Sequence, residues 1–158
     1  MINNEKKFNQ YGEPGLEVQG IVIHNTSILP SAVDYENYYE NECKTNQATH
    51  FVVDWQNVVD ILPLDWKVYS TGKGQDWAFN HCISIDICSN INDDKYYAGE
   101  RKAVELIERL MEEYNLTSSD IYFHSDFNNR AYCPSDILNR YLIKKNFIKN
   151  YFEKNKED

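Results

Sequence analysis

The chain has 158 residues, enough for one domain with a hydrophobic core, because a domain of this size buries about 70% of its unfolded surface. No stretch approaches the roughly 18 consecutive apolar residues of a membrane helix, so we expect a globular monomer with no membrane partner. The formal net charge is −9 at pH 7. A surface this acidic repels phosphate backbones, which excludes nucleic acid as a partner.

The N-terminus and the cysteines both indicate a reducing compartment at synthesis. The first eight residues carry charge but lack an apolar segment, so they do not have the pattern of a secretory signal peptide, and we expect synthesis in the cytosol. The four cysteines form neither a CxxC pair nor a disulfide framework. We interpret most of them as small buried residues that remain thiols.

Breaker residues and charge divide the chain into three parts. Residues 1–18 are polar and contain two glycines and a proline, so they are expected to form an N-terminal arm that precedes the core. Residues 19–143 are expected to form the domain itself. Residues 144–158 have a helical pattern that becomes highly charged, which fits either a terminal helix or a linker into a further domain.

The first half of the expected domain contains three strand candidates. A β-branched run at 20–24 lacks polar alternation and ends in His24, as expected for a strand buried on both faces. A short helix is expected at 32–39. Segments 50–54 and 58–62 are separated by three residues and predict a hairpin. The stretch 63–81 is expected to be a long loop, whose aromatic residues either line a groove or pack over the core edge.

The second half predicts a strand covered by a helix. In the segment 82–88 three isoleucines alternate with Cys82, Ser84, Asp86 and Cys88, so Asp86 projects from the face opposite the isoleucines. The segment 96–114 has apolar residues at helical spacing and is expected to cover the isoleucine face. The complete pattern predicts an α/β fold with a central mixed sheet and helices on both faces.

Two histidines and one cysteine are candidates for a metal site. His24 ends the first strand, and His124 ends a last short strand at 121–124. Pro134 suits the first position of a helix, which puts Cys133 at the N-cap, where the helix dipole lowers the pKa of a thiol. Two imidazoles and a thiolate can bind Zn²⁺ and leave a fourth position for water. The spacing alone leaves coincidence as an equal alternative.

Asp86 and His50 are candidates for roles beside such a metal. Asp86 fits a general acid or base that faces the site, and it fits equally well a carboxylate that is hydrogen-bonded at the sheet edge. His50 starts its strand and is considered as a side chain that points into the cleft, whereas His81 is interpreted as a loop residue.

Five separated segments, in order, resemble one known family. They are IVIHNT (21–26), HFVVD (50–54), ISIDIC (83–88), KYYAGE (95–100) and HSDFNNRAYCP (124–134). The chain resembles the type-2 N-acetylmuramoyl-L-alanine amidases of the peptidoglycan-recognition-protein superfamily, especially the catalytic domains of phage endolysins. The resemblance covers most of 19–143 and implies the α/β fold of that family.

The resemblance assigns roles to the candidate residues. It implies that His24, His124 and Cys133 bind zinc and that Asp86 stands where these endolysins commonly have a glutamate, one methylene longer. The family's cation, usually a lysine two positions before the cysteine, is replaced here by Ala131. Arg130, one residue earlier, is expected to stabilise the oxyanion if the loop bulges, with an exposed turn arginine as the alternative; His50 is the competing donor.

The function implied by the resemblance is zinc-dependent hydrolysis of the amide between N-acetylmuramic acid and L-alanine in peptidoglycan, by a protein without a signal peptide that acts on the bacterial cell wall. Two alternatives stay open at this stage. One is a peptidoglycan-binding module of the same fold without catalysis, against which the presence of Cys133 argues. The other is a zinc peptidase that cuts a different wall amide.

Overall fold

A mixed five-stranded sheet forms the centre of the computed structural model, which describes residues 5–26, 29, 31–72, 74–90 and 92–153. The strand order is β4-β3-β6-β2-β7. Neighbours pair in parallel except β4, which pairs antiparallel with β3. The bounds are β2 (Gly20–Thr26), β3 (Phe51–Val53), β4 (Val58–Asp60), β6 (Cys82–Cys88) and β7 (Ile121–Phe123). The expected hairpin and the expected mixed sheet are therefore confirmed.

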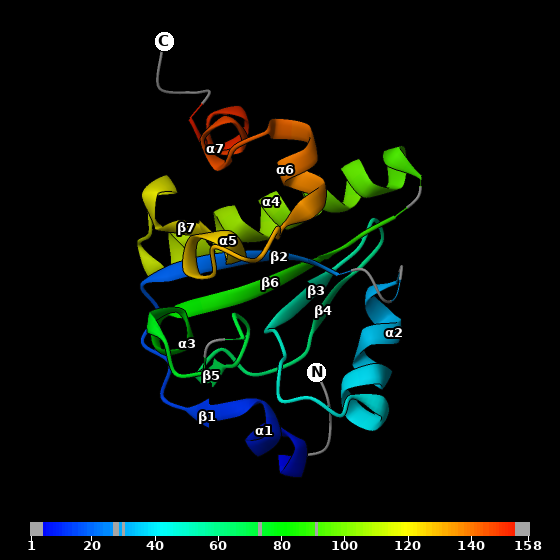
Figure 1. Ribbon diagram of the computed structural model, residues 1–158, viewed down its shortest axis with the longest axis vertical. Coiled ribbons are helices and arrows are strands. Elements are labelled where there is room, and N and C mark those ends of the chain that lie inside the picture. The colour runs from blue at the N-terminus through cyan, green and yellow to red at the C-terminus, as the bar shows by residue number, and fades with distance from the viewer. Residues whose placement is uncertain (1–4, 27–28, 30, 73, 91, 154–158) are drawn as a thin grey trace.

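Helices cover both faces of this sheet (Figure 1). One face carries α4 (Asp93–Tyr114), α6 (Ser135–Tyr141) and α7 (Lys144–Phe152). Toward the other face lie α1 (Glu5–Tyr11), α2 (Ala32–Asn37), the π-helical turn Tyr38–Glu42 and α3 (Trp77–His81). A two-stranded sheet of β1 (Gly12–Pro14) and β5 (Trp66–Val68) lies on that side too. The 3₁₀ turn Ser118–Asp120 precedes β7, and α5 (His124–Phe127) follows it.

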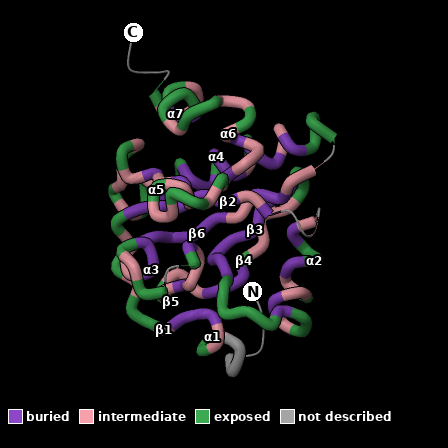
Figure 2. Tube along the Cα trace, viewed as in Figure 1, coloured by how far each residue is buried: buried purple, intermediate pink, exposed green. Residues whose placement is uncertain are grey.

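The alternation along β6 sorts its side chains as predicted. Its three isoleucines are fully buried in one cluster with Ala103 and Ile107 of α4. The tube in Figure 2 shows β2 and β6 as the largely buried centre of the molecule. Helix α4 begins at Asp93, three residues before the expected start, because the side chain of Asn92 caps it by accepting a hydrogen bond from the Lys95 N–H.

The N-terminal segment and the stretch 63–81 differ from expectation. Tyr11 is fully buried, and its hydroxyl donates to the carbonyl oxygen of Tyr39 at 2.6 Å. Because β1 pairs with β5, residues 5–14 belong to the fold and are not an arm outside the core. The stretch 63–81 contains β5 and α3, and Tyr69 stacks on Phe79 there, so these aromatic rings pack together. Residues 1–4 lie outside the described residues.

The C-terminal segment forms helix α7 through Phe152, with residues 154–158 outside the described part. Phe147 of α7 is fully buried in the same cluster as β2, β6 and β7. Within the described ranges, no helix combines the length and the apolar character needed to cross a membrane.

A buried carboxylate joins α4 to the two C-terminal helices. Glu100 on α4 has no exposed side-chain surface, and Arg140 of α6 donates to it at 2.8 Å. The hydroxyls of Tyr141 and Tyr151 also donate to this carboxylate, at 3.1 Å and 2.7 Å. A buried charge is tolerated when it is paired and hydrogen-bonded in this way, so the position of α6 depends on Glu100.

We expect Arg140→Met to lower the free energy of unfolding by about 2–4 kcal/mol, because it leaves the buried Glu100 carboxylate without its cation. Lys67→Met is the matched control. Lys67 is as exposed as Arg140, 22% against 24%, but its partner Glu13 is 46% exposed, so its loss should cost less than about 1 kcal/mol. Urea unfolding of both variants measures the difference, and equal destabilisation would contradict the role assigned to Glu100.

Candidate metal centre

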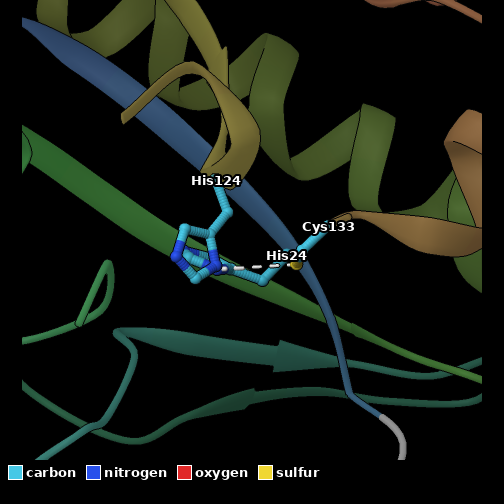
Figure 3. Close-up of side chains that lie close together, drawn as sticks. All are labelled: His24, His124 and Cys133. Atoms are coloured by element: carbon cyan, nitrogen blue, oxygen red, sulfur yellow. Dashed lines mark hydrogen bonds between the residues drawn. The ribbon is translucent and has the colours of Figure 1, made fainter. Parts of the chain in front are cut away.

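Three side chains from separate segments converge at one edge of the sheet. His24 lies in β2, His124 follows the neighbouring parallel strand β7, and Cys133 precedes α6. Parallel neighbours bring their carboxyl ends to the same edge, which is why two histidines 100 residues apart in the sequence meet. Their potential ligand atoms all lie within 4.8 Å of one another, and Figure 3 shows the three side chains pointing toward one another.

The distances suit a tetrahedral metal ion. The Sγ atom of Cys133 lies 3.9 Å from Nδ1 of His24. Two ligands bound to one zinc ion, with Zn–S near 2.3 Å and Zn–N near 2.0 Å, lie about 3.5 Å apart. The ring centroids of His24 and His124 are 4.8 Å apart. The donor set of two imidazoles and one thiol therefore fits zinc, and leaves one position of a tetrahedron for water.

Burial prepares His24 as a ligand. Its side chain is 5% exposed, and burial, followed by the proximity of His124, lowers its pKa to about 3. The ring is therefore neutral at physiological pH, which is the form that binds metals. Its Nε2 atom is buried without a hydrogen-bond partner among the described residues. An orphaned polar atom of this kind is uncommon in a folded protein and draws attention to a functional site.

A backbone carbonyl orients His124. Its Nε2 atom lies 2.9 Å from the carbonyl oxygen of Thr71. A carbonyl can only accept, so Nε2 carries the proton and Nδ1 is the atom available to a metal. The Thr71 hydroxyl in turn donates to Asp76 at 2.6 Å, and Asp76 caps α3. Sequence patterns gave no signal for this contact, because a backbone carbonyl has no signature of its own.

Cys133 differs from expectation in position and in pKa. Helix α6 is capped by Pro134, so Cys133 precedes the N-cap and the helix has seven residues. Burial raises the pKa of the thiol to about 11, although a hydrogen bond with the Asn25 backbone lowers it. The net shift of the thiol pKa is therefore upward, opposite to the expected lowering, because burial outweighs the hydrogen bond. A bound metal would itself deprotonate this thiol.

Asp86 lies beside the three potential ligands in a pocket of about 250 Å³. It is the register partner of His24 on the neighbouring parallel strand, so both side chains project from the same face of the sheet. Burial raises the pKa of Asp86 to about 7, while the Thr49 side chain opposes the rise. A carboxyl group with a pKa near neutrality can both accept and return a proton.

The remaining pocket wall is rich in tyrosine. Tyr35 and Tyr39 of the α2 region contribute to it together with Tyr38, and loop residues complete it. Their spacing at i, i+3 and i+4 on one helical segment is visible in the sequence, but this spacing is equally typical of a helix face that packs on the core, so it does not by itself indicate a site. Aromatic and hydroxyl groups of this kind suit a ligand with both polar and apolar parts.

His50 and Arg130 are not among the residues that line the pocket. His50 is fully buried, its Nδ1 accepts from the Ser84 N–H at 2.9 Å, and its Nε2 lies 2.8 Å from the carbonyl oxygen of Trp66. Both ring nitrogens thus join backbone segments, which corrects the expected oxyanion role of His50. Arg130 is exposed in the turn before Cys133. The structure therefore favours the alternative of a surface arginine.

Solved structures with a similar fold cover nearly the whole chain. The structure of PlyL matches with a TM-score of 0.87 at 23% identity and covers 96% of this chain and 94% of its own. The solution structure of the PlyG catalytic domain matches with a TM-score of 0.81 at 24% identity, covering 95% and 92%. These likenesses confirm the α/β fold that the sequence predicts.

Curated relatives extend the comparison to sequence. The N-acetylmuramoyl-L-alanine amidase CwlA of Bacillus subtilis (strain 168) is 30% identical over 125 residues, which are 78% of this chain and 45% of CwlA. XlyB, an N-acetylmuramoyl-L-alanine amidase of the same organism, is 30% identical over 137 residues, 85% of this chain and 43% of XlyB. The chain thus spans less than half the length of these two relatives.

A family model described as N-acetylmuramoyl-L-alanine amidase matches residues 14–136. The match contains His24, Asp86, His124 and Cys133, and it covers the sheet from β2 to β7. The chain therefore belongs to the N-acetylmuramoyl-L-alanine amidase family.

Proposed function

We propose that this protein is a zinc-dependent N-acetylmuramoyl-L-alanine amidase, which hydrolyses the amide between N-acetylmuramic acid and L-alanine in peptidoglycan. The observation that carries the proposal is the convergence of His24, His124 and Cys133, with Asp86 in the same pocket, in a member of this family. Three ligands from separate segments and an adjacent carboxyl group are what a hydrolytic zinc site needs.

His24, His124 and Cys133 would hold the ion. Zinc in such a site polarises an amide carbonyl and lowers the pKa of a bound water toward about 7. Asp86 then accepts the proton of the attacking water and delivers it to the departing amine of L-alanine.

We further propose that the protein acts on the bacterial cell wall as a lytic enzyme of the endolysin type. One similar solved structure, at 25% identity, is that of a mutant endolysin from Bacillus subtilis. The tyrosine wall beside the ligands would contact the muramyl peptide, because aromatic faces pack against sugar rings and peptide while hydroxyls bond to their polar groups.

Removing a ligand should remove the metal. Elemental analysis of the purified protein is expected to give one zinc per chain, and His124→Ala should abolish most of it because two ligands bind zinc far more weakly than three. His81→Ala is the matched control, since His81 lies outside the pocket and its Nδ1 contacts the carbonyl oxygen of Glu17. Full zinc retention in His124→Ala would overturn the ligand assignment.

Asp86→Asn should keep both zinc and fold but lower kcat by about 10²–10⁴-fold, the range typical of a lost general base. The exposed Asp60→Asn serves as the control for a carboxylate outside the pocket. Asp86→Glu tests whether the aspartate side chain is too short for efficient proton transfer, because the glutamate common in the family is one methylene longer. A raised kcat would mean that the shorter side chain limits proton transfer. Wild-type turnover in Asp86→Asn would make Asp86 a structural residue.

Product analysis separates the proposed reaction from its alternatives. Digestion of purified peptidoglycan should release peptides that begin with a free L-alanine amine, while the glycan strands keep intact lactyl groups on muramic acid. Mass spectrometry of the digest measures both ends. New amines at a crosslink or within the stem would indicate a zinc peptidase, and binding without any new amine would indicate a non-catalytic module.

A further inference from the structure

Asn25 lies next to His24, on the opposite face of β2. Successive side chains of a strand point to opposite faces, so His24 faces the metal pocket while Asn25 faces α4 and α6. The Nδ2 group of Asn25 donates to the carbonyl oxygen of Ile87 at 3.2 Å and to the Tyr96 hydroxyl at 3.2 Å. These two donor contacts fix the amide, and they direct its oxygen away from the sheet.

The fixed amide oxygen holds the start of α6. The Oδ1 atom of Asn25 accepts a hydrogen bond from the backbone N–H of Asp136 at 3.0 Å. The backbone of Asn25 also forms a hydrogen bond with Cys133. Asn25 thus forms hydrogen bonds with both ends of the segment 133–136.

Hydrogen bonds with Ser125 and Ser89 also hold the segment 133–136. Pro134 has no backbone N–H to donate. The Cys133 carbonyl accepts from the Ser125 N–H at 3.0 Å, and the Asp136 carboxylate accepts from the Ser89 hydroxyl at 2.6 Å. The hydrogen bonds of Asn25, together with the 3.9 Å contact between Cys133 Sγ and His24 Nδ1, tie the segment to β2, the strand that carries His24.

We propose that Asn25 is a positioning residue for metal binding, which holds the Cys133 thiol in reach of an ion bound by His24 and His124. This proposal rests on the proposed metal centre and adds a residue that carries no ligand atom itself. Residues that orient metal ligands commonly change metal affinity by 10- to 100-fold when they are replaced. The effect should appear in metal affinity rather than in the stability of the whole fold.

The test is competition for zinc between the purified protein and a chelator of known affinity. We expect Asn25→Ala to weaken zinc binding by about 10- to 100-fold. Asn25→Leu fills nearly the same volume without an acceptor and should lose as much, even if the alanine variant fails to fold. Asn25→Asp keeps an acceptor for the Asp136 N–H but loses the two Nδ2 donor contacts, so it should weaken zinc binding less than Asn25→Leu does. Asn57→Ala removes an asparagine of the β3–β4 turn and should leave the zinc affinity unchanged.

Cobalt substitution reports the thiolate directly. A Co²⁺-loaded wild type should show a thiolate-to-cobalt charge-transfer band, which weakens in Asn25→Leu and persists in Asn25→Asp, because the leucine variant releases Cys133 from the site. Zinc affinity and cobalt spectra of Asn25→Leu equal to those of the wild type would overturn the proposal for Asn25 alone. Failure of the wild type itself to bind zinc would instead overturn the proposed metal function, and the role of Asn25 with it.

Discussion

The parallel register between β2 and its neighbours is the constraint on which the site depends. His24 is aligned with Asp86 on β6, and the strand β7 that leads into His124 pairs with β2 on its other side. A slip of β2 by one residue would turn His24 toward α4 and bring Asn25 to the pocket, since side chains alternate with period two. The buried Ile21 and Ile23 of β2 prevent that slip, because it would move both side chains out of the core. Packing of the core on one face of the sheet therefore fixes the positions of His24 and Asp86 on the other face.

Burial lowers the pKa of one site residue and raises the pKa of two others, and every one of these shifts has the same physical cause. It lowers the pKa of His24 to about 3 and raises the pKa of Asp86 to about 7 and of Cys133 to about 11. Each shift favours the uncharged form, because desolvation penalises whichever form carries charge. Desolvation in this pocket thus disfavours both a buried imidazolium and a buried thiolate. A dication that enters it meets a neutral His24 and must displace the thiol proton of Cys133.

Features that depend on local periodicity could be predicted from the sequence, and features that depend on distant packing could not. The alternation from Cys82 to Cys88 predicted both the strand and its two faces, and the strand ends predicted that His24 and His124 would meet. No local pattern shows that Tyr11 is buried against Tyr39, so the sequence alone does not place the N-terminal segment in the core. The partners of His50 are backbone groups from two other segments, which a list of histidines cannot reveal.

Helix α6 connects the candidate metal centre to the rest of the core, and it is held near both ends. Near its C-terminus Arg140 is fixed by the buried Glu100 of α4, and its guanidinium stacks 3.6 Å from the centre of the Tyr97 ring. At its N-terminus Asp136 is bound by the side chain of Asn25. A seven-residue helix has little stability of its own, because helix formation is cooperative and short helices are marginal in water. These contacts therefore decide where α6 lies. Because Cys133 lies just before the α6 cap, the same contacts decide whether its thiol can reach the two histidines.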